Sequence, residues 1–166
     1  MLIYCLFCET AKCDMVVKAI ERDFGCAALS PKQIQHTRSG GKMVDIVHDL
    51  LPGYVLVYAE QKPLDVRRAQ KIQGVIRCLC TTDKQYELSG NDERFALMLL
   101  HRDGVIGKTR VYREGQVIRV CEGAYDGLET KILKVNRPKN RMQIEIPFAN
   151  RFIRTWVEFE IAEDAQ

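Results

Sequence analysis

The first hundred residues alternate between short apolar runs and segments in which apolar side chains recur at helical spacing. Residues 2–8 form an apolar, β-branched and aromatic run that predicts a strand. Across residues 11–24 the apolar positions return every three or four residues between charged ones, which predicts an amphipathic helix. Thr10 precedes this helix as a candidate N-cap, and Gly25 follows it where a left-handed C-cap belongs.

The next segments predict the rest of an α+β sheet with helices laid on it. Residues 34–47 alternate around a Ser39-Gly40-Gly41 turn and predict a polar hairpin. The continuous apolar run 54–58 favours a central strand that is buried on both faces. Residues 64–72 predict a short basic helix, residues 75–79 a strand, and residues 92–100 a second long helix capped by Ser89 or Asn91.

The pattern changes near residue 114. Residues 103–113 hold two glycines and three cations without a strong period, which is typical of a linker. Beyond Gly115, short alternating segments at 117–120, 130–135, 143–146 and 152–159 predict a small all-β barrel. The sequence therefore predicts two domains, residues 1–104 and 114–166, joined by a linker at 105–113.

Composition narrows the function classes only slightly. The 166 residues are 46% hydrophobic and 28% charged, as in ordinary globular proteins. The net charge of +3 does not by itself indicate a nucleic-acid binder, so the distribution of cations must decide. Seven cysteines without a secretory signal indicate reduced thiols, and no apolar run reaches the length of a membrane span. We expect a cytoplasmic monomer that does not contact a membrane.

Two motifs together resemble one family. The run Leu50-Leu51-Pro52-Gly53-Tyr54-Val55-Leu56-Val57 resembles the Pro-Gly-Tyr corner of the NusG family of transcription elongation factors. The family's KOW pattern is matched by Gly115, Ile118, Val120, Gly123, Tyr125 and Gly127. The resemblance implies a NusG-type N-terminal domain followed by a KOW barrel, and a transcription factor without enzymatic activity. The opening strand lacks the family's tryptophan, and the chain is most similar to specialised paralogues, the LoaP-like operon-specific antiterminators.

The resemblance also implies a polymerase-binding surface. In the family, an apolar concavity beside the Pro-Gly-Tyr corner binds the clamp helices of RNA polymerase. Carried over to this chain, that surface comprises Tyr4, Phe7, Leu51, Pro52, Gly53 and Tyr54. Aromatic anchors of this kind supply a large contact area for little lost entropy. The alternative interpretation is that the same residues only form a core and a turn.

Basic residues form clusters whose cations can contact phosphates. The N-terminal clusters are His36, Arg38 and Lys42 at the hairpin turn, Arg67, Arg68 and Lys71 on the short helix, and Arg102, Lys108, Arg110 and Arg113 leading into the linker. The KOW cluster comprises Lys131, Lys134, Arg137, Lys139 and Arg141. The family's specialised members read a nascent RNA hairpin or the non-template DNA strand, and its KOW module binds Rho or a ribosomal protein. A solvated charged surface is the alternative for each cluster.

Catalytic and metal chemistry is the weakest hypothesis. Cys8, Cys13, Cys78 and Cys80 lack the spacing of a zinc knuckle and are more typical of small buried apolar residues. No nucleophile with a base and an orienting group can be assembled, and we expect neither a metal nor a cofactor. The preferred hypothesis is an operon-specific antiterminator. A general elongation factor and a KOW-type protein that binds RNA or the ribosome are the alternatives.

Overall fold

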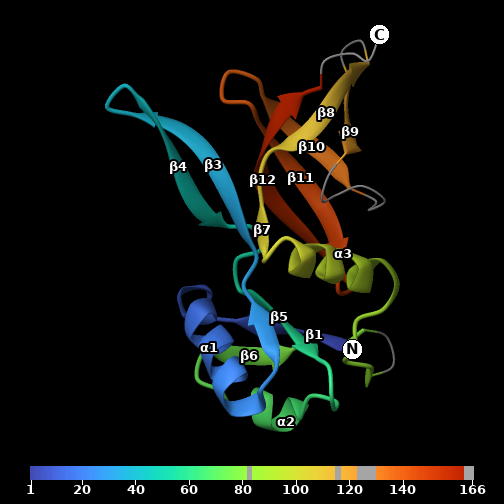
Figure 1. The fold of residues 1–166 in the computed structure, drawn as a ribbon. Coiled ribbons are helices and arrows are strands. Elements are labelled where there is room, and N and C mark those ends of the chain that lie inside the picture. The colour runs from blue at the N-terminus through green and yellow to red at the C-terminus, as the bar shows by residue number, and fades with distance from the viewer. Residues whose placement is uncertain (82–83, 115–116, 123–129, 163–166) are drawn as a thin grey trace.

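The computed structural model describes residues 1–81, 84–114, 117–122 and 130–162, and Figure 1 shows its elements in chain order. Its helical elements are the 3-10 turn η1 (Thr10–Lys12), α1 (Cys13–Phe24), α2 (Val66–Ala69) and α3 (Gly90–His101). The N-terminal strands are β1 (Leu2–Cys8), β2 (Ala27–Leu29), β3 (Lys32–Ser39), β4 (Lys42–Asp49), β5 (Tyr54–Ala59) and β6 (Val75–Cys78). The later strands are β7 (Val105–Ile106), β8 (Thr109–Glu114), β9 (Val117–Glu122), β10 (Lys131–Asn136), β11 (Arg141–Phe148) and β12 (Arg151–Ile161).

The N-terminal sheet has the strand order β2-β5-β1-β6. Strand β5 lies inside this sheet and all six of its residues are buried, which confirms the predicted central strand. On one face of the sheet, Val16 and Ile20 of α1 pack against Leu6 and Val55. The opposite face therefore needs its own cover, since a central strand without alternating polar residues is stable only when both faces are packed.

Helix α1 ends as predicted but begins differently. Gly25 adopts the left-handed conformation (φ 64°) at its C-cap, where a side chain with a Cβ would be strained. Thr10 is not the N-cap, however, because the chain leaves β1 through the 3-10 turn η1, which places Lys12 at the N-cap without a side-chain hydrogen bond. For α3, Ser89 holds the N-cap position and Asn91 lies within the helix.

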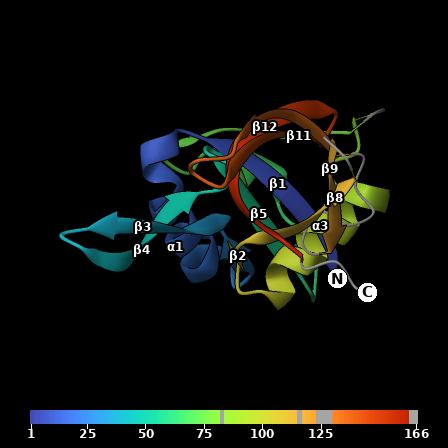
Figure 2. The same cartoon turned by 90° about the horizontal axis from the view of Figure 1, so that it is seen from above.

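The predicted polar hairpin is confirmed as β3 and β4, which pair from Lys32↔Asp49 to Ser39↔Lys42. Gly40 and Gly41 form its turn with positive φ angles of 57° and 78°, as a tight two-residue hairpin connection requires. The tip of this two-stranded ribbon projects away from the rest of the molecule (Figures 1 and 2). Every residue of β4 before Asp49 is exposed.

The C-terminal sheet has the strand order β10-β11-β12-β8-β9 and curves strongly in the view of Figure 2. Residues 105–113, expected as a linker, contain β7 and most of β8. Strand β7 pairs in parallel with β3, and β8 pairs in parallel with β12. The local sequence gives no signal for such pairing, because the partner of each short strand lies far away along the chain. Gly115, Gly123, Tyr125 and Gly127 of the KOW pattern lie outside the described residues.

One hydrophobic core joins the N-terminal and C-terminal sheets. It contains Leu56 of β5, Phe95 and Leu99 of α3, and Ile144 and Phe148 of β11. In Figure 1 helix α3 lies between the two sheets, so it covers the face of the N-terminal sheet that α1 leaves open. Among the described residues no helix is long and apolar enough to cross a membrane.

The turn before β5 generates a stability prediction. Gly53 has φ 88°, and a Cβ at this position would lie 3.0 Å from the Cys8 carbonyl oxygen and 3.2 Å from the Phe7 ring. Gly53→Ala is expected to lower the free energy of unfolding by about 2–3 kcal/mol, measured by urea denaturation. Gly40→Ala is the matched control, because it shares the positive φ but has open space around it. An equal loss in both variants would contradict the close approach at Gly53.

Candidate functional site

The Pro-Gly-Tyr corner is a tight turn fastened to β1. The Tyr54 N–H donates to the Leu51 carbonyl oxygen at 3.1 Å, and the Cys8 N–H donates to the Gly53 carbonyl oxygen at 2.7 Å. Leu51 is fully buried and Pro52 is exposed. Tyr54, the expected aromatic anchor, is only 8% exposed. The corner is therefore formed as the sequence predicts, but its apolar side faces the interior in this structure.

A chain of aromatic rings explains the burial of Tyr54. The Phe7 and Tyr54 ring centroids lie 5.5 Å apart, and the Tyr54 and Phe148 centroids lie 6.5 Å apart at an interplanar angle of 73°. Phe148 in turn packs edge-on against Phe95 of α3 at 5.6 Å. Offset and edge-to-face pairs at these distances are the favoured aromatic geometries. The C-terminal sheet thus covers the corner through one buried ring, Phe148.

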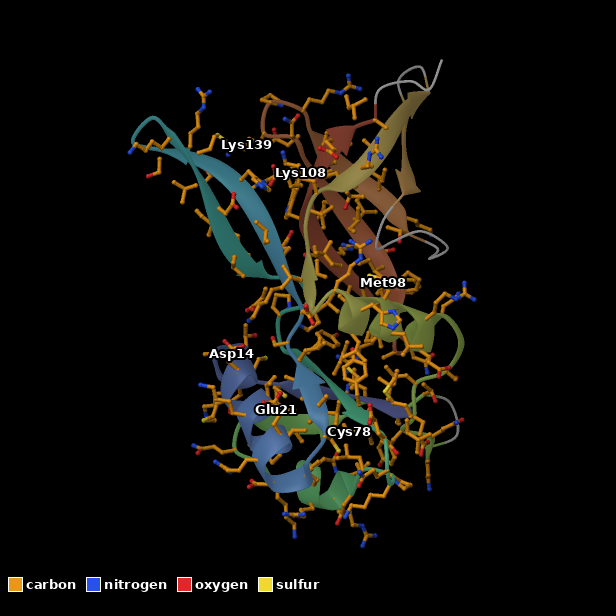
Figure 3. All side chains as sticks on the ribbon, in the orientation of Figure 1. Asp14, Glu21, Cys78, Met98, Lys108 and Lys139 are labelled. Atoms are coloured by element: carbon orange, nitrogen blue, oxygen red, sulfur yellow. The ribbon has the colours of Figure 1, made fainter. Side chains whose placement is uncertain are left out.

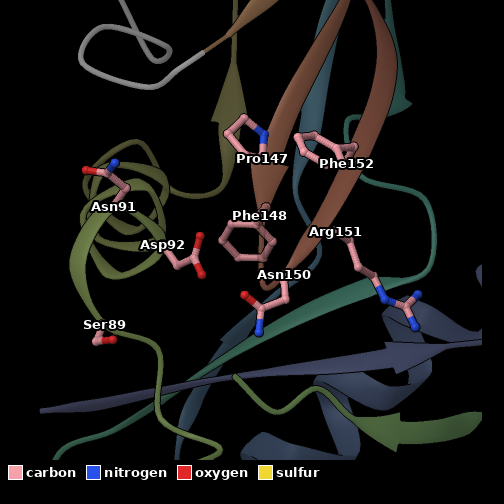
Figure 4. A pocket seen from close by; sticks show the side chains of 8 residues that line it. All are labelled: Ser89, Asn91, Asp92, Pro147, Phe148, Asn150, Arg151 and Phe152. Atoms are coloured by element: carbon pink, nitrogen blue, oxygen red, sulfur yellow. The ribbon is translucent and has the colours of Figure 1, made fainter. Parts of the chain in front are cut away.

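Polar groups hold the β11–β12 turn beside this aromatic chain. The Ala149 N–H donates to Asp92 Oδ2 of α3 at 3.1 Å, and the Arg151 guanidinium lies 5.3 Å from the centroid of the Phe7 ring. A pocket of about 500 Å³ opens next to them between the start of α3 and the β11–β12 turn, with Asp92 and Phe148 on its wall (Figure 4). Burial raises the pKa of the Asp92 carboxyl, although its hydrogen bond with Ala149 opposes that shift.

Tyr4 does not join the corner. Successive side chains of β1 point to opposite faces, so Phe7 faces Tyr54 while Tyr4 packs with the α1 side of the sheet. The Tyr4 hydroxyl accepts the Leu64 N–H at 3.4 Å and donates to Glu87 Oε1 at 3.3 Å, and burial raises its pKa. The structure therefore separates Tyr4 from the other five residues of the expected surface.

A second contact between the N-terminal and C-terminal parts centres on Glu158, a buried carboxylate of β12. The backbone N–H of His36 donates to Glu158 Oε2 at 2.7 Å, and His36 Nδ1 lies 3.3 Å from the same oxygen. Lys108 Nζ lies 3.8 Å from Glu158 Oε1, and the Arg141 guanidinium donates to the Gln35 side-chain oxygen. His36, Lys108 and Arg141 came from three separate basic clusters, and the fold gathers them around this one contact.

Helix α2 borders a groove, and the sequence predicted only its cations on the α2 side. Arg68 and Lys71 line it together with Lys18 and Arg22 of α1, and its apolar lining includes Met15, Phe24 and Ile72. Asp23 is the only carboxylate among the lining residues, and it pairs with Arg22 at 2.8 Å. The i,i+4 spacing of Lys18 and Arg22 on the polar face of α1 was the available signal.

The remaining predicted cations are dispersed. Arg38 and Lys42 lie at the exposed tip of the β3–β4 ribbon, and Arg67 and Arg102 are exposed. Arg110 forms an ion pair with Glu160 at 3.9 Å, and the side chain of Arg113 lies outside the described residues. Lys131, Lys134, Arg137 and Lys139 are exposed along β10 and its following turn, where Figure 3 labels Lys139.

The cysteines show no sign of a metal centre in the part of the chain that the structure describes. No group of three or more His, Cys, Asp or Glu side chains there is placed to hold a metal ion. Burial raises the pKa of the Cys8 and Cys78 thiols to about 12, so the thiolate form that binds zinc is disfavoured. Cys5, Cys8, Cys13 and Cys78 are buried free thiols that contribute to the core.

Several known proteins resemble this chain in sequence or in fold. No protein-family model matches the chain. The transcription termination/antitermination protein NusG of Xylella fastidiosa is 27% identical over 155 residues, covering 84% of this chain and 81% of the relative. The protein of the same name from Lactococcus lactis is 25% identical over 126 residues, covering 70% and 64%. A solved structure described as "Domain interaction in Thermotoga maritima NusG" superposes with a TM-score of 0.59 over 95% of this chain and 93% of that chain, at 13% identity.

The raised pKa of Asp92 predicts a pH dependence. A carboxyl whose pKa is raised by folding stabilises the native state when it is protonated, and this stability is lost as the pH rises through the raised pKa. Between about pH 3.5 and pH 7 the free energy of unfolding of the natural protein should therefore fall relative to that of Asp92→Asn. Denaturant titrations of both proteins across this range measure the difference. A difference that is constant with pH would contradict the burial of this carboxyl.

Proposed function

We propose that the chain is a transcription elongation factor of the NusG family that binds RNA polymerase and promotes antitermination at specific operons. The proposal includes a division into an N-terminal domain (1–104), a connecting segment (105–113) and a KOW domain (114–166). It places the protein in the cytoplasm and assigns it no enzymatic activity. The names of the curated relatives, transcription termination/antitermination protein NusG, support the general part of this function.

The aromatic corner carries the polymerase-binding part of the proposal. Phe7, Tyr54 and the Pro52-Gly53 rim form a preshaped apolar surface, of the kind that accepts the side chains of a helical hairpin. Phe148 occupies this surface here, and a tyrosine that is 8% exposed offers almost no area to a partner. Binding of the polymerase clamp helices at this corner therefore requires the β11–β12 turn to move away, so Phe148 and the polymerase compete for the same rings.

The groove between α1 and α2 is our candidate for reading an operon-specific signal. Four cations and one carboxylate line it, and the Arg68 guanidinium lies 4.5 Å from the centroid of the Phe24 ring. Cations around an apolar floor suit a nucleic-acid strand, since phosphates bind the rim while a base can enter the floor. The groove and the aromatic corner lie on opposite faces of the N-terminal sheet, so both can be occupied at once. The signal is a nascent RNA hairpin or the non-template DNA strand.

The KOW domain is the remaining partner surface, for which the family suggests Rho or a ribosomal protein. A general NusG-type factor is the second candidate function, because the curated relatives carry that general name. The two candidates differ in one respect that experiment can separate. The general factor acts on any transcript, whereas the specialised one acts only on transcripts with its signal.

The affinity of variants for RNA polymerase tests whether the aromatic corner is the binding surface. The variant Asp92→Ala/Glu158→Ala removes the two carboxylates that bridge the N-terminal and C-terminal parts, and is expected to bind RNA polymerase about tenfold more tightly than the natural chain. Adding Phe7→Ala and Tyr54→Ala to that variant should weaken binding by about thirtyfold, as for hot-spot rings. Ile76→Ala, at an exposed apolar residue of β6, is the matched control and should leave the affinity unchanged. Biolayer interferometry with core polymerase gives the affinities, and unchanged binding after loss of both rings would reject the corner.

Recognition of an operon-specific signal is tested by a separate transcription assay. Single-round transcription through an intrinsic terminator is compared between the protein's own downstream leader and an unrelated leader. We expect readthrough on the native leader only. The variant Lys18→Ala/Lys71→Ala should lose this readthrough while it still binds RNA polymerase. Lys62→Ala, at an exposed lysine outside the groove, is the control. Equal readthrough on both leaders would instead favour the general elongation factor.

A further inference from the structure

The outer face of the C-terminal sheet exposes two aromatic rings, Phe152 and Trp156. Side chains of β11 alternate strictly, with Met142, Ile144, Ile146 and Phe148 buried and the residues between them partly exposed. Their partners on β12 include Phe152 and Trp156, which are 71% and 38% exposed. Phe152 is thus largely open to solvent and Trp156 partly so, which leaves one face of each ring accessible to a ligand.

The strand register places both rings on one face. Phe152 pairs with Pro147, Arg154 with Glu145, and Trp156 with Gln143, and these six residues all point outward. Phe152 and Trp156 are four residues apart on β12, which separates their Cα atoms by roughly 13 Å along the strand. Arg154 lies between them and its Nε atom is 2.9 Å from Glu145 Oε2. The face therefore carries an aromatic ring at each end of a short row of outward side chains.

Cations border the aromatic row on the β10 side. Lys134 pairs with Gln143 and so lies in the same cross-strand row as Trp156, while Lys131 pairs with Glu145. Arg137 and Lys139 extend this edge in the exposed turn that follows β10. The one outward carboxylate of β11, Glu145, is 13% exposed and already paired with Arg154. The accessible charge of this face is thus positive.

We propose that the outer face of β10, β11 and β12 binds single-stranded RNA, with Phe152 and Trp156 stacking on bases and Lys131 and Lys134 contacting phosphates. Every base has a π-face, so rings on a sheet surface hold single strands with little regard to sequence. Gln143 lies beside Trp156 with an amide that can both donate and accept, which matches the ribose 2′-hydroxyl that distinguishes RNA from DNA.

This site is distinct from the polymerase-binding corner, although Phe152 also lines the pocket beside Phe148. Phe148 points to the core side of β11, whereas the RNA-binding face is its opposite side, exposed while the corner is covered. RNA binding therefore does not require the β11–β12 turn to leave Tyr54. Failure of polymerase binding would leave this inference intact, and failure of RNA binding would leave the polymerase-binding proposal intact.

The chain contains one tryptophan, so its fluorescence reports on this face directly. Titration with an unlabelled single-stranded RNA of about 12 nucleotides should quench the Trp156 emission as bases stack on the indole. Anisotropy of the same RNA carrying a fluorophore supplies an affinity that does not depend on the tryptophan. Trp156→Ala should weaken that affinity about tenfold or more, and Trp156→Phe, which keeps a ring, should retain most of it.

Further variants with matched controls distinguish the contribution of ring stacking to RNA binding from the contribution of the lysine charges. Phe152→Ala should weaken binding severalfold, and its control Ile76→Ala, at another exposed apolar residue, should not. Lys134→Ala should reduce the slope of log affinity against log salt by about 0.7, whereas Lys62→Ala should change neither slope nor affinity. Circular dichroism confirms that each variant is folded.

Three results would overturn the proposal. Binding of RNA without quenching of Trp156 would place the RNA elsewhere, and equal or tighter binding of DNA with the same sequence would reject the assignment to RNA. If neither the RNA nor the DNA binds at low salt, the proposal is rejected and the exposed rings are instead a contact for a protein.

Discussion

The insertion of Phe148 between Tyr54 and Phe95 is the contact on which the arrangement of the whole molecule depends. The N-terminal sheet has a central strand that is buried on both faces, and α1 covers only one of them. Helix α3 and the β11–β12 turn cover the other, and Phe148 joins all three elements in one core. Burying aromatic area on this scale stabilises the closed arrangement more than any of the surrounding polar contacts.

The same geometry makes the closed arrangement reversible in principle. Apart from Phe148, the polar contacts between the N-terminal and C-terminal parts include those of Asp92 with Ala149 beside this ring and of Glu158 with His36 at the other end of the β11–β12 pair. Hydrogen bonds of this kind contribute about 1–3 kcal/mol each, much less than a domain's own core. An apolar partner that replaces Phe148 on Tyr54 compensates for most of the lost burial. A surface covered by the chain itself is thereby kept available for a partner.

Charge is distributed in a comparable way. Lys108 pairs with Glu158 at the junction, whereas Arg110 pairs with Glu160 within the C-terminal sheet. Lys18, Lys71, Lys131 and Lys134 are exposed and border either the groove between α1 and α2 or the two aromatic rings of the outer sheet face. The pair of Lys108 with Glu158 stabilises the closed form, whereas the exposed cations can release counterions when a phosphate backbone binds. The net charge of the chain, +3, conceals this division.

The sequence by itself determined the local elements: the apolar run of β5, the period of α1, the left-handed Gly25 and the two-glycine hairpin turn each reflect backbone preferences that act over a few residues. It also located the Pro-Gly-Tyr corner, because that turn is local as well. Only the tertiary structure decided that Phe148 covers this corner, that Tyr4 faces the other way, and that residues 105–113 form strands. These features arise from pairing and packing between segments far apart in the chain, and such contacts leave no periodic signal in either segment alone.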